Sequence, residues 1–155
     1  MRITTASTSD ADAVADLWVE LADDQQRHGS HLLGEANRPA IREAILQRTV
    51  TDDLLVARRD GRILGFVMYT IEGGRYEQDV TLGLVENLYV RSDSRRDGIG
   101  SALLDGAEQR LTDAGATAIT IEAMTDNEAA REFYATHGYE PHRVELEKSM
   151  ESDTS

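Results

Sequence analysis

Cysteine is absent from this chain of 155 residues. Its absence excludes disulfides, thiolate metal sites and a cysteine nucleophile. Long apolar runs are absent too, since none approaches the roughly 20 residues that a helix needs to cross a bilayer. The first residues, Met1–Thr5, lack the apolar stretch of a signal peptide. These absences predict a cytoplasmic protein with no membrane partner.

Lysine is almost absent: Lys148 is the only one, and every other basic residue is arginine. With 29 acidic residues against 16 basic ones, the net charge is -13. Binding of duplex nucleic acid needs a basic face, so nucleic acid is not an expected partner. An acidic surface could attract polyamines or other cations. The carboxylates are spread along the chain, however, which favours a general adaptation to a salt-rich cytoplasm and predicts a halophilic protein.

No internal repeat, low-complexity linker or domain boundary interrupts the chain. The apolar fraction of 40% is adequate for a globular core. The length favours one compact domain. We therefore expect a single domain over residues 1–148, followed by a solvated tail over residues 149–155.

The first half of the chain predicts two helices among hairpin-linked strands. After a β-like start at Ile3, apolar residues recur at i, i+3, i+4 and i+7, so the first helix is expected to run to about Gly29. Asn37 and Pro39 can open the second helix. Strands are expected at 53–58, 63–71 and 80–90, with a hairpin turn at Asp60-Gly61.

The second half changes to helical spacing. Apolar residues from Ile99 to Leu111 predict a helix that Gly115 can end, and 118–121 reads as a short strand. Asp126 can cap another helix, which ends at Gly138, and 143–147 alternates like a final strand. Hairpins followed by β-α-β crossovers predict an α/β fold with a mixed sheet.

The stretch 84–104 carries the chemistry: a strand, a short polar loop with Gly98 and Gly100, and a helix start. Free backbone N–H groups at a helix N-terminus form an anion site together with the helix dipole. Glycine lets the backbone approach phosphate oxygens. A Walker loop would need a lysine before Ser101, and a dinucleotide fingerprint would need glycine where Leu103 stands, so both nucleotide interpretations fail.

Two motifs resemble those of the Gcn5-related N-acetyltransferases. Arg95-x-x-Gly98-x-Gly100 matches the (Gln/Arg)-x-x-Gly-x-(Gly/Ala) pyrophosphate loop of that family, and 86–90 looks like its fourth strand. Residues 127–139 resemble its Asn-x-x-Ala-x-x-Phe-Tyr-x-x-x-Gly-(Phe/Tyr) segment. The resemblance extends from Ile3 to about Leu146. One departure is Arg96, at a position that is often glycine in the family.

The resemblance implies a mixed, splayed sheet of six to seven strands flanked by about four helices. It also implies acetyl-CoA as cosubstrate and no metal. The pyrophosphate would lie on the loop, and the pantetheine arm would pair like an extra strand where two strands splay. The implied cosubstrate-binding residues are Leu88, Tyr89, Val90, Arg95, Arg96, Asp97, Gly98, Ile99, Gly100, Ser101 and Asn127.

Attack of a neutral amine on a thioester needs a proton acceptor for the ammonium and a donor for the leaving thiolate. The resemblance points to Glu86 as the base, with two alternatives: a surface ion pair, or a water chain acting as base. It points to Tyr134 as the acid, the alternative being a core tyrosine beside Phe133. Four scattered histidines suggest no metal cluster, and His28-x-x-His31 alone is a weak metal signal.

The expected function is therefore direct transfer of acetyl from acetyl-CoA to a primary amine of a small molecule, such as an amino compound or polyamine. Acetylation of protein N-termini or lysines is an alternative within the same class. A non-catalytic acyl-CoA-binding regulatory module is an alternative from another class. The sequence leaves the oligomeric state open, a homodimer included.

Overall fold

A computed structural model gives the arrangement of the chain and describes residues 1–74 and 76–151. Its strands are β1 (Arg2–Thr5), β2 (Leu54–Arg59), β3 (Arg62–Ile71), β4 (Leu82–Val90) and β5 (Ala118–Ile121). Its helices are α1 (Ala11–Gln26), α2 (Arg38–Val50), α3 (Ile99–Asp113) and α4 (Glu128–Thr136). Short 3-10 turns lie at Thr8–Asp10, Glu35–Asn37 and Ser92–Ser94. The expected mixed α/β architecture is confirmed.

The sheet has the order β1-β2-β3-β4-β5. All neighbours pair antiparallel except β4 and β5, which are parallel. The parallel pairing starts at Leu82↔Ala118 and ends at Val85↔Ile121. Because β4 continues to Val90, its last residues have no strand partner on the β5 side among the described residues. The expected splay between two strands is therefore present, between β4 and β5.

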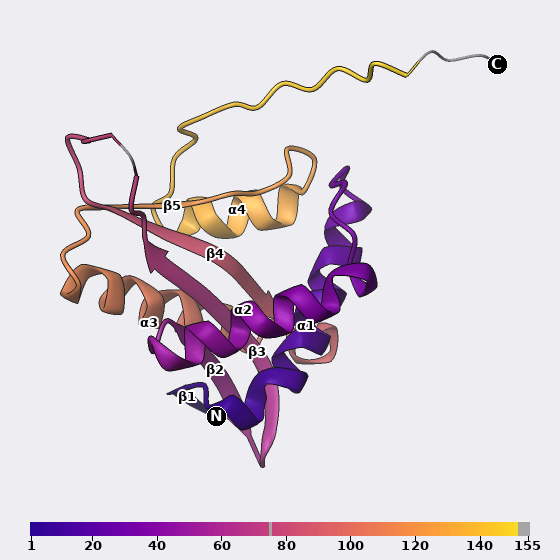
Figure 1. Ribbon diagram of the computed structural model, residues 1–155, viewed down its shortest axis with the longest axis vertical. Helices are drawn as coiled ribbons and strands as arrows, with labels where there is room; N and C mark the ends of the chain where they lie inside the picture. Colours follow the sequence, from indigo (N-terminus) through magenta and orange to yellow (C-terminus); the bar gives the residue numbers. More distant parts are fainter. Residues whose placement is uncertain (75, 152–155) are drawn as a thin grey trace.

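Helices cover both faces of the sheet (Figure 1). On one face α1 and α2 enclose a buried cluster that includes Leu17, Trp18 and Phe66. On the other face α3 encloses a second cluster that includes Val67, Leu103 and Leu104. The helix α4 lies along β5 and contains no fully buried residue. The half of the molecule around β5 and α4 is thus the least covered part of the fold.

Glycine positions mark the turns as the sequence predicts. Asp60 (φ 52°) and Gly61 (φ 76°) both have positive φ, the geometry of a two-residue hairpin turn between β2 and β3. Gly115 (φ 101°) follows α3, and Gly138 (φ 90°) follows α4. In both places the left-handed conformation ends the helix.

Two local expectations are wrong. The first helix ends at Gln26 rather than near Gly29. The cap of α4 is Asn127, whose Oδ1 accepts a hydrogen bond from the N–H of Ala130 at 3.1 Å, and not Asp126. Asp126 instead lies 3.2 Å from the ring of His28. Asp126 and Asn127 could each cap α4. Because Asp126 contacts His28 in the α1–α2 loop, Asn127 is the residue that caps the helix.

The expected final strand over 143–147 is also absent, so the described residues form five strands rather than six or seven. Alternation alone does not make a strand, because strand hydrogen bonds need a neighbouring backbone. In this structure the segment runs away from the sheet (Figure 1). Among the helices of the described residues, none is both long and apolar enough to cross a membrane.

Candidate functional site

The loop between β4 and α3 presents a row of free donors. None of the backbone N–H groups from Arg96 to Ser101 donates a hydrogen bond to another described residue; the first helical bond is Ala102 N–H to the Gly98 carbonyl, at 3.1 Å. Gly98 is the N-cap of α3 in the left-handed conformation, with φ 76°. Six consecutive donors are thus free at the positive end of the helix dipole, which favours binding of an anion in front of α3.

Arg96 also has positive φ, 72°. For a residue with a side chain the left-handed conformation costs roughly 1–2 kcal/mol. This geometry gives the physical reason why glycine would be favoured at that position of the loop. The Arg96 side chain is exposed and forms no ion pair with a described residue. Its charge is therefore available to a ligand in front of the loop.

The two loop glycines differ in their surroundings. A Cβ added at Gly98 would meet nothing within 4 Å, so the space in front of it is open. A Cβ at Gly100 would lie 3.4 Å from Phe133 Cζ and 3.7 Å from Val90 Cγ2. Gly100 thus allows α4 and β4 to pack closely against the start of α3. A larger residue at Gly100 would disturb this packing whether or not it meets a ligand.

A bulge in β4 precedes its unpaired end. Met68 pairs with Asn87 and Tyr69 with Val85, so Glu86 is an extra residue in the β3–β4 ladder. The N–H of Arg91 donates to Leu64 of β3 at 2.8 Å. By alternation along the strand, the backbone of Tyr89 also faces β3.

The same alternation turns the backbone groups of Leu88 and Val90 toward the open splay. The Val90 carbonyl accepts a hydrogen bond from Arg95 Nε at 3.1 Å. No described residue accepts a hydrogen bond from the N–H of Leu88 on that side. Of the three β4 residues expected to bind a cosubstrate, Leu88 and Val90 therefore present main-chain groups to the splay, whereas Tyr89 does not.

Tyr89 and Arg95 lie together on the α1 side of β4. The Arg95 guanidinium carbon is 5.3 Å from the centroid of the Tyr89 ring. Burial raises the pKa of Tyr89, and the nearby carboxylates of Glu20 and Asp24 on α1 raise it further. Arg95 is thus engaged with its own strand, and two carboxylates of α1 lie near the same face of β4.

Tyr134 lies on α4 between two other aromatic rings. Its ring meets Phe133 edge-on at 5.5 Å and Tyr139 at 6.1 Å. Burial raises the pKa of Tyr134 to about 12. Its hydroxyl makes no hydrogen bond within the described parts of the chain, whereas the hydroxyl of Tyr139 donates to Glu108 at 2.7 Å. Tyr134 thus has a protonated phenol with an unused donor.

Glu86 forms an ion pair. Its carboxylate lies 2.8 Å from Arg48 of α2, and the two side chains are 28% and 27% exposed. The expected surface pair is therefore present at this position. Glu86 is the bulge residue of β4, and its carboxylate is occupied by a cation, so a role as base would require this pair to open.

Two further residues border the loop. His137 Nε2 lies 3.0 Å from the hydroxyl of Ser101 in the first turn of α3, and its ring packs against Phe133. His137 was not expected among the site residues; its place just before Gly138, after Tyr134, was the only available signal. The side-chain oxygen of Asn127 is used in capping α4, which leaves its amide N–H groups for another partner.

The predicted site residues thus fall into two groups. The loop, the open side of β4 and α4 come together, because Phe133 of α4 packs at Gly100 of α3. Glu86, Tyr89 and Arg95 lie toward α1 and α2. The described residues contain no group of three histidine, aspartate or glutamate side chains that could hold a metal.

Comparison with known proteins agrees with this geometry. The profile of the acetyltransferase (GNAT) family matches residues 15–139. The uncharacterised N-acetyltransferase YhfO of Bacillus subtilis is 28% identical over 145 residues, 90% of each chain. An uncharacterised N-acetyltransferase of Lactobacillus delbrueckii is 24% identical over 118 residues, 68% of each chain.

The fold has close counterparts among solved structures. A GCN5-related N-acetyltransferase from Ralstonia eutropha JMP134 superposes with a TM-score of 0.76 at 22% identity, covering 96% of this chain and 97% of that one. The family profile spans both motifs, from the loop at Arg95–Gly100 to the Phe133-Tyr134 helix. The chain therefore belongs to the acetyltransferase (GNAT) family, and it is an acyl-CoA-dependent acetyltransferase.

Proposed function

We propose that the protein transfers acetyl from acetyl-CoA to a primary amine of a small cationic molecule, an amino compound or a polyamine. The observation that carries this proposal is the combination of free donors from Arg96 to Ser101 with the unpaired end of β4. The first suits a pyrophosphate and the second suits an extended amide-containing arm. Both features open on the same end of the sheet.

The free loop donors and the unpaired end of β4 together suggest how the cosubstrate binds. The loop N–H groups would donate to the pyrophosphate, and Arg96 would add a positive charge. The backbone of Leu88 and Val90 would pair with the pantetheine amides, as an added strand does. The N–H of Leu88 would then be available to stabilise the negative oxygen that forms when the thioester carbonyl is attacked.

The chemistry needs three events. The nitrogen of a neutral amine attacks the carbonyl carbon, the C–S bond breaks, and the ammonium proton leaves the nitrogen. Tyr134 would donate a hydrogen bond to the sulfur. Since a free thiol has a pKa of about 8.5, a phenol of pKa about 12 does not give up its proton completely to a thiolate. The help from Tyr134 is therefore stabilisation of developing charge.

Removal of the ammonium proton is assigned to Glu86 or to water. Glu86 is the bulge residue of β4, two positions before Leu88, and this proximity to the open end of the strand favours it. The ion pair with Arg48 opposes it, because the carboxylate is already in contact with a cation. We propose that Glu86 acts when an incoming cationic acceptor displaces Arg48.

Two observations favour a small cationic acceptor over a peptide. The carboxylates of Glu20 and Asp24 on α1 lie near Tyr89 of β4, where they would attract a cationic acceptor. Two loops also approach each other at the open end, since His28 lies 3.2 Å from Asp126 and a Cβ at Gly29 would lie 3.7 Å from Met124. We propose that this contact leaves room for a small acceptor beside β4 rather than for an extended polypeptide.

The test of the acceptor class is thiol release with polyamines, amino acids, aminoglycosides and peptides at several salt concentrations. We expect kcat/KM to be highest for a small amine with more than one positive charge. A peptide N-terminus or peptide lysine as the best acceptor would replace this proposal with protein acetylation.

The test of the cosubstrate site is the affinity for acetyl-CoA measured by calorimetry. Arg96→Asn keeps a residue that tolerates positive φ and removes one charge. Arg42→Asn, on exposed α2, removes the same charge far from the loop and serves as the control. We expect roughly tenfold weaker binding for Arg96→Asn alone. Equal affinities in the two variants would show that Arg96 does not contact the phosphates.

A further inference from the structure

The loop that follows β4, residues 92–98, contains negative as well as positive side chains. Its two arginines and two aspartates leave the loop without net charge. One of the arginines, Arg95, is engaged with its own strand. Asp97 lies within the row of free N–H donors from Arg96 to Ser101. Because consecutive Cα atoms are about 3.8 Å apart, an anion on these donors lies within about 10 Å of the Asp97 carboxylate, which repels it.

Arginines from outside the loop lie against these carboxylates. In the β2–β3 hairpin, Arg59 Nη1 is 3.8 Å from Asp97 Oδ2, and Arg62 Nη2 donates to Asp93 Oδ2 at 3.1 Å. Arg91, at the end of β4, adds a longer contact, with its Nε 3.8 Å from Asp93 Oδ1. Each aspartate of the 92–98 loop therefore faces an arginine of the hairpin.

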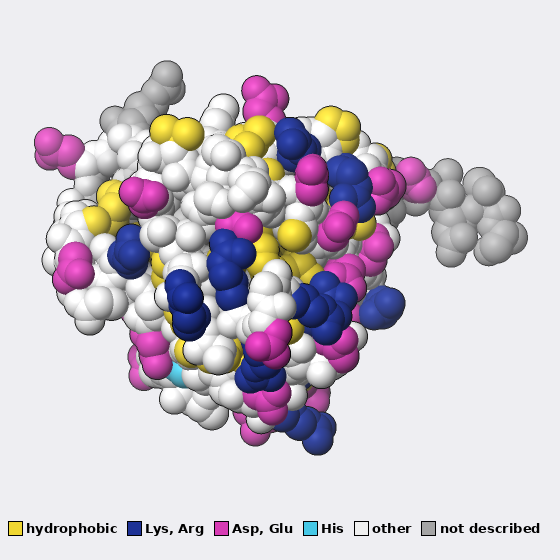
Figure 2. Space-filling view, turned by 90° about the horizontal axis from the view of Figure 1, so that it is seen from below, with side chains coloured by type: hydrophobic (Ala, Val, Ile, Leu, Met, Phe, Trp, Pro, Cys, Tyr) yellow, Lys and Arg dark blue, Asp and Glu magenta, His cyan; other side chains and the backbone are white. Residues whose placement is uncertain are grey.

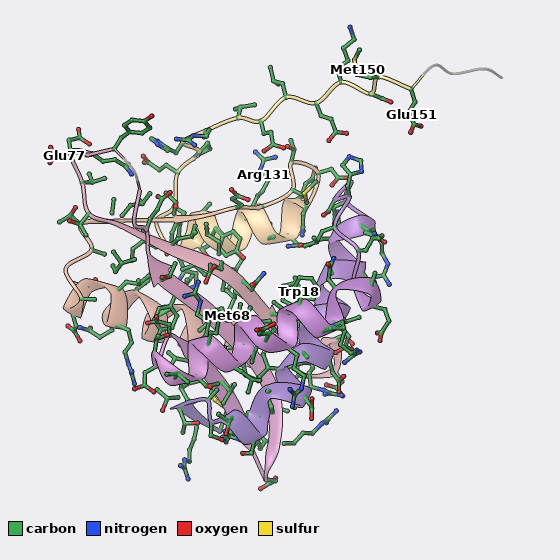
Figure 3. All side chains as sticks on the ribbon, viewed as in Figure 1. Trp18, Met68, Glu77, Arg131, Met150 and Glu151 are labelled. Atoms are coloured by element: carbon green, nitrogen blue, oxygen red, sulfur yellow. The ribbon has the colours of Figure 1, made fainter. Side chains whose placement is uncertain are left out.

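The hairpin arginines are surface residues. In Figure 3 the hairpin between β2 and β3 forms the lowest point of the folded body, and the side chains around it extend into open space. The side chains of Arg59 and Arg62 are 46% and 52% exposed. Exposed ion pairs contribute little to the stability of a fold. These two pairs therefore matter more for the charge of the 92–98 loop than for the stability of the protein.

We propose that the β2–β3 hairpin is part of the acetyl-CoA site, because Arg59 and Arg62 neutralise the carboxylates of the 92–98 loop. Residues 59–62 contribute two arginines and Asp60, so the hairpin turn and the loop together have a charge of +1 in a chain whose net charge is -13. The two arginines act through the loop aspartates and are positioning residues. The inference rests on the proposed binding of the pyrophosphate by the loop and adds a second element to that site.

Calorimetry of acetyl-CoA binding to three variants tests this compensation of charge. Arg59→Gln with Arg62→Gln should lower the affinity about threefold to tenfold in 0.1 M potassium chloride. Asp93→Asn with Asp97→Asn should raise it by at least as much, because the aspartates belong to the loop itself. The variant with all four substitutions should bind as tightly as the unsubstituted chain, or more tightly. All four side chains are exposed, which favours normal folding of the variants.

Other roles for the hairpin arginines predict different results. If the ion pairs only hold the shape of the loop, both double variants break the same contacts, so both would bind more weakly. If the arginines contact the phosphates directly, the fourfold variant would stay well below the unsubstituted chain. Either result would overturn the inference. In 1 M potassium chloride the Debye length is about 3 Å, so the differences should shrink to under about twofold; differences that persist there would also overturn it.

The ion pair between Arg42 of α2 and Asp12 of α1 is the matched control, since it is also exposed. Arg42→Gln and Asp12→Asn, alone and together, should leave the affinity within about twofold of the unsubstituted value. Arg96→Asn separates this inference from the proposed site. If Arg96→Asn weakens binding and the hairpin variants do not, the inference alone is wrong. If none of these variants changes the affinity, the proposed loop site is wrong as well.

Discussion

At the scale of single residues, the site is defined by groups that the fold leaves without partners. The loop donors from Arg96 to Ser101, the Leu88 N–H and the Tyr134 hydroxyl have no acceptors among the described residues. Polar groups in a folded chain usually form hydrogen bonds. A cluster of donors without acceptors therefore indicates a place where a ligand can accept these hydrogen bonds.

Tyr134→Phe keeps the aromatic ring and removes only the hydroxyl. We expect kcat to fall by about 10- to 100-fold, with the affinity for acetyl-CoA unchanged. Because burial raises the pKa of Tyr134 to about 12, the phenol stays protonated up to about pH 11, and the deficit should be constant from pH 6 to 10. The measurement is kcat against pH for both proteins. Equal rates throughout would make Tyr134 a packing residue.

Glu86→Gln removes the proposed base. A base is needed only while the amine carries its proton, so the deficit in kcat/KM should shrink as pH approaches the pKa of the acceptor, about 10 for a primary amine. Arg48→Gln breaks the same ion pair and keeps the carboxylate, so it should retain activity. A deficit that does not change with pH would assign proton removal to water.

Asp10 is the most buried carboxylate of an ion pair in the described chain. Burial alone would raise its pKa, but the hydrogen bond from Arg58, the Ser7 N–H at 2.8 Å and the Arg58 charge together lower it. A lowered folded pKa gives stability that is present above the unfolded value, about 3.9, and is lost as pH falls through the folded value.

Asp10→Asn should therefore lower the free energy of unfolding by about 1–3 kcal/mol at pH 7 and by much less below pH 3. Asp12→Asn, whose side chain is 80% exposed and pairs with Arg42, is the control and should change it by under about 1 kcal/mol. Denaturant unfolding at both pH values makes the comparison. A deficit of equal size at both would mean that the charge of Asp10 contributes nothing.

At the scale of elements, the site depends on how closely β3 and β4 approach. Gly65 of β3 lies opposite Val90, and an added Cβ would lie only 2.6 Å from the Tyr89 carbonyl oxygen. That oxygen belongs to the strand backbone, which cannot move aside as a flexible side chain can. Gly65 therefore sets the position of the β4 end that borders the splay.

Gly65→Ala should destabilise the protein by about 1–3 kcal/mol and weaken the binding of acetyl-CoA, because it displaces the end of β4. Gly73→Ala, in the β3–β4 loop where a Cβ meets nothing within 4 Å, is the matched control. Thermal unfolding and calorimetry measure the two effects. If Gly65→Ala is as stable as Gly73→Ala, then β3 and β4 can move apart at this point with little loss of stability.

Much of this arrangement is predictable from local pattern. The strand, loop and helix around Gly98 follow from turn residues and apolar spacing, which act over a few neighbours. The Glu86–Arg48 pair, the Ser101–His137 contact and the His28–Asp126 contact join residues far apart in the sequence. The prediction of a strand over 143–147 was wrong for the same reason. Its alternating pattern is local, whereas strand hydrogen bonds need the backbone of a residue far away in the sequence.

At the scale of the whole molecule, charge is the dominant feature. On the face seen in Figure 2, arginine and carboxylate side chains lie beside one another. Ion pairs such as Arg58–Asp10 and Arg62–Asp93 account for part of this mixing. The net charge of -13 nevertheless leaves many carboxylates without a cation. Their repulsion acts on the folded chain, where they are held closer together than in the unfolded chain.

We predict that the melting temperature rises with salt. The Debye length falls from about 30 Å at 0.01 M to about 3 Å at 1 M, so repulsion between exposed carboxylates is largely screened in molar potassium chloride. A gain of about 1–2 kcal/mol corresponds to roughly 2–8 °C for a chain of this size. The control is the same titration near pH 4.6, the isoelectric point, where the net charge vanishes and the dependence should vanish with it. A melting temperature that stays flat or falls with salt at pH 7 would contradict the prediction, because the excess carboxylates would then cost the folded state nothing.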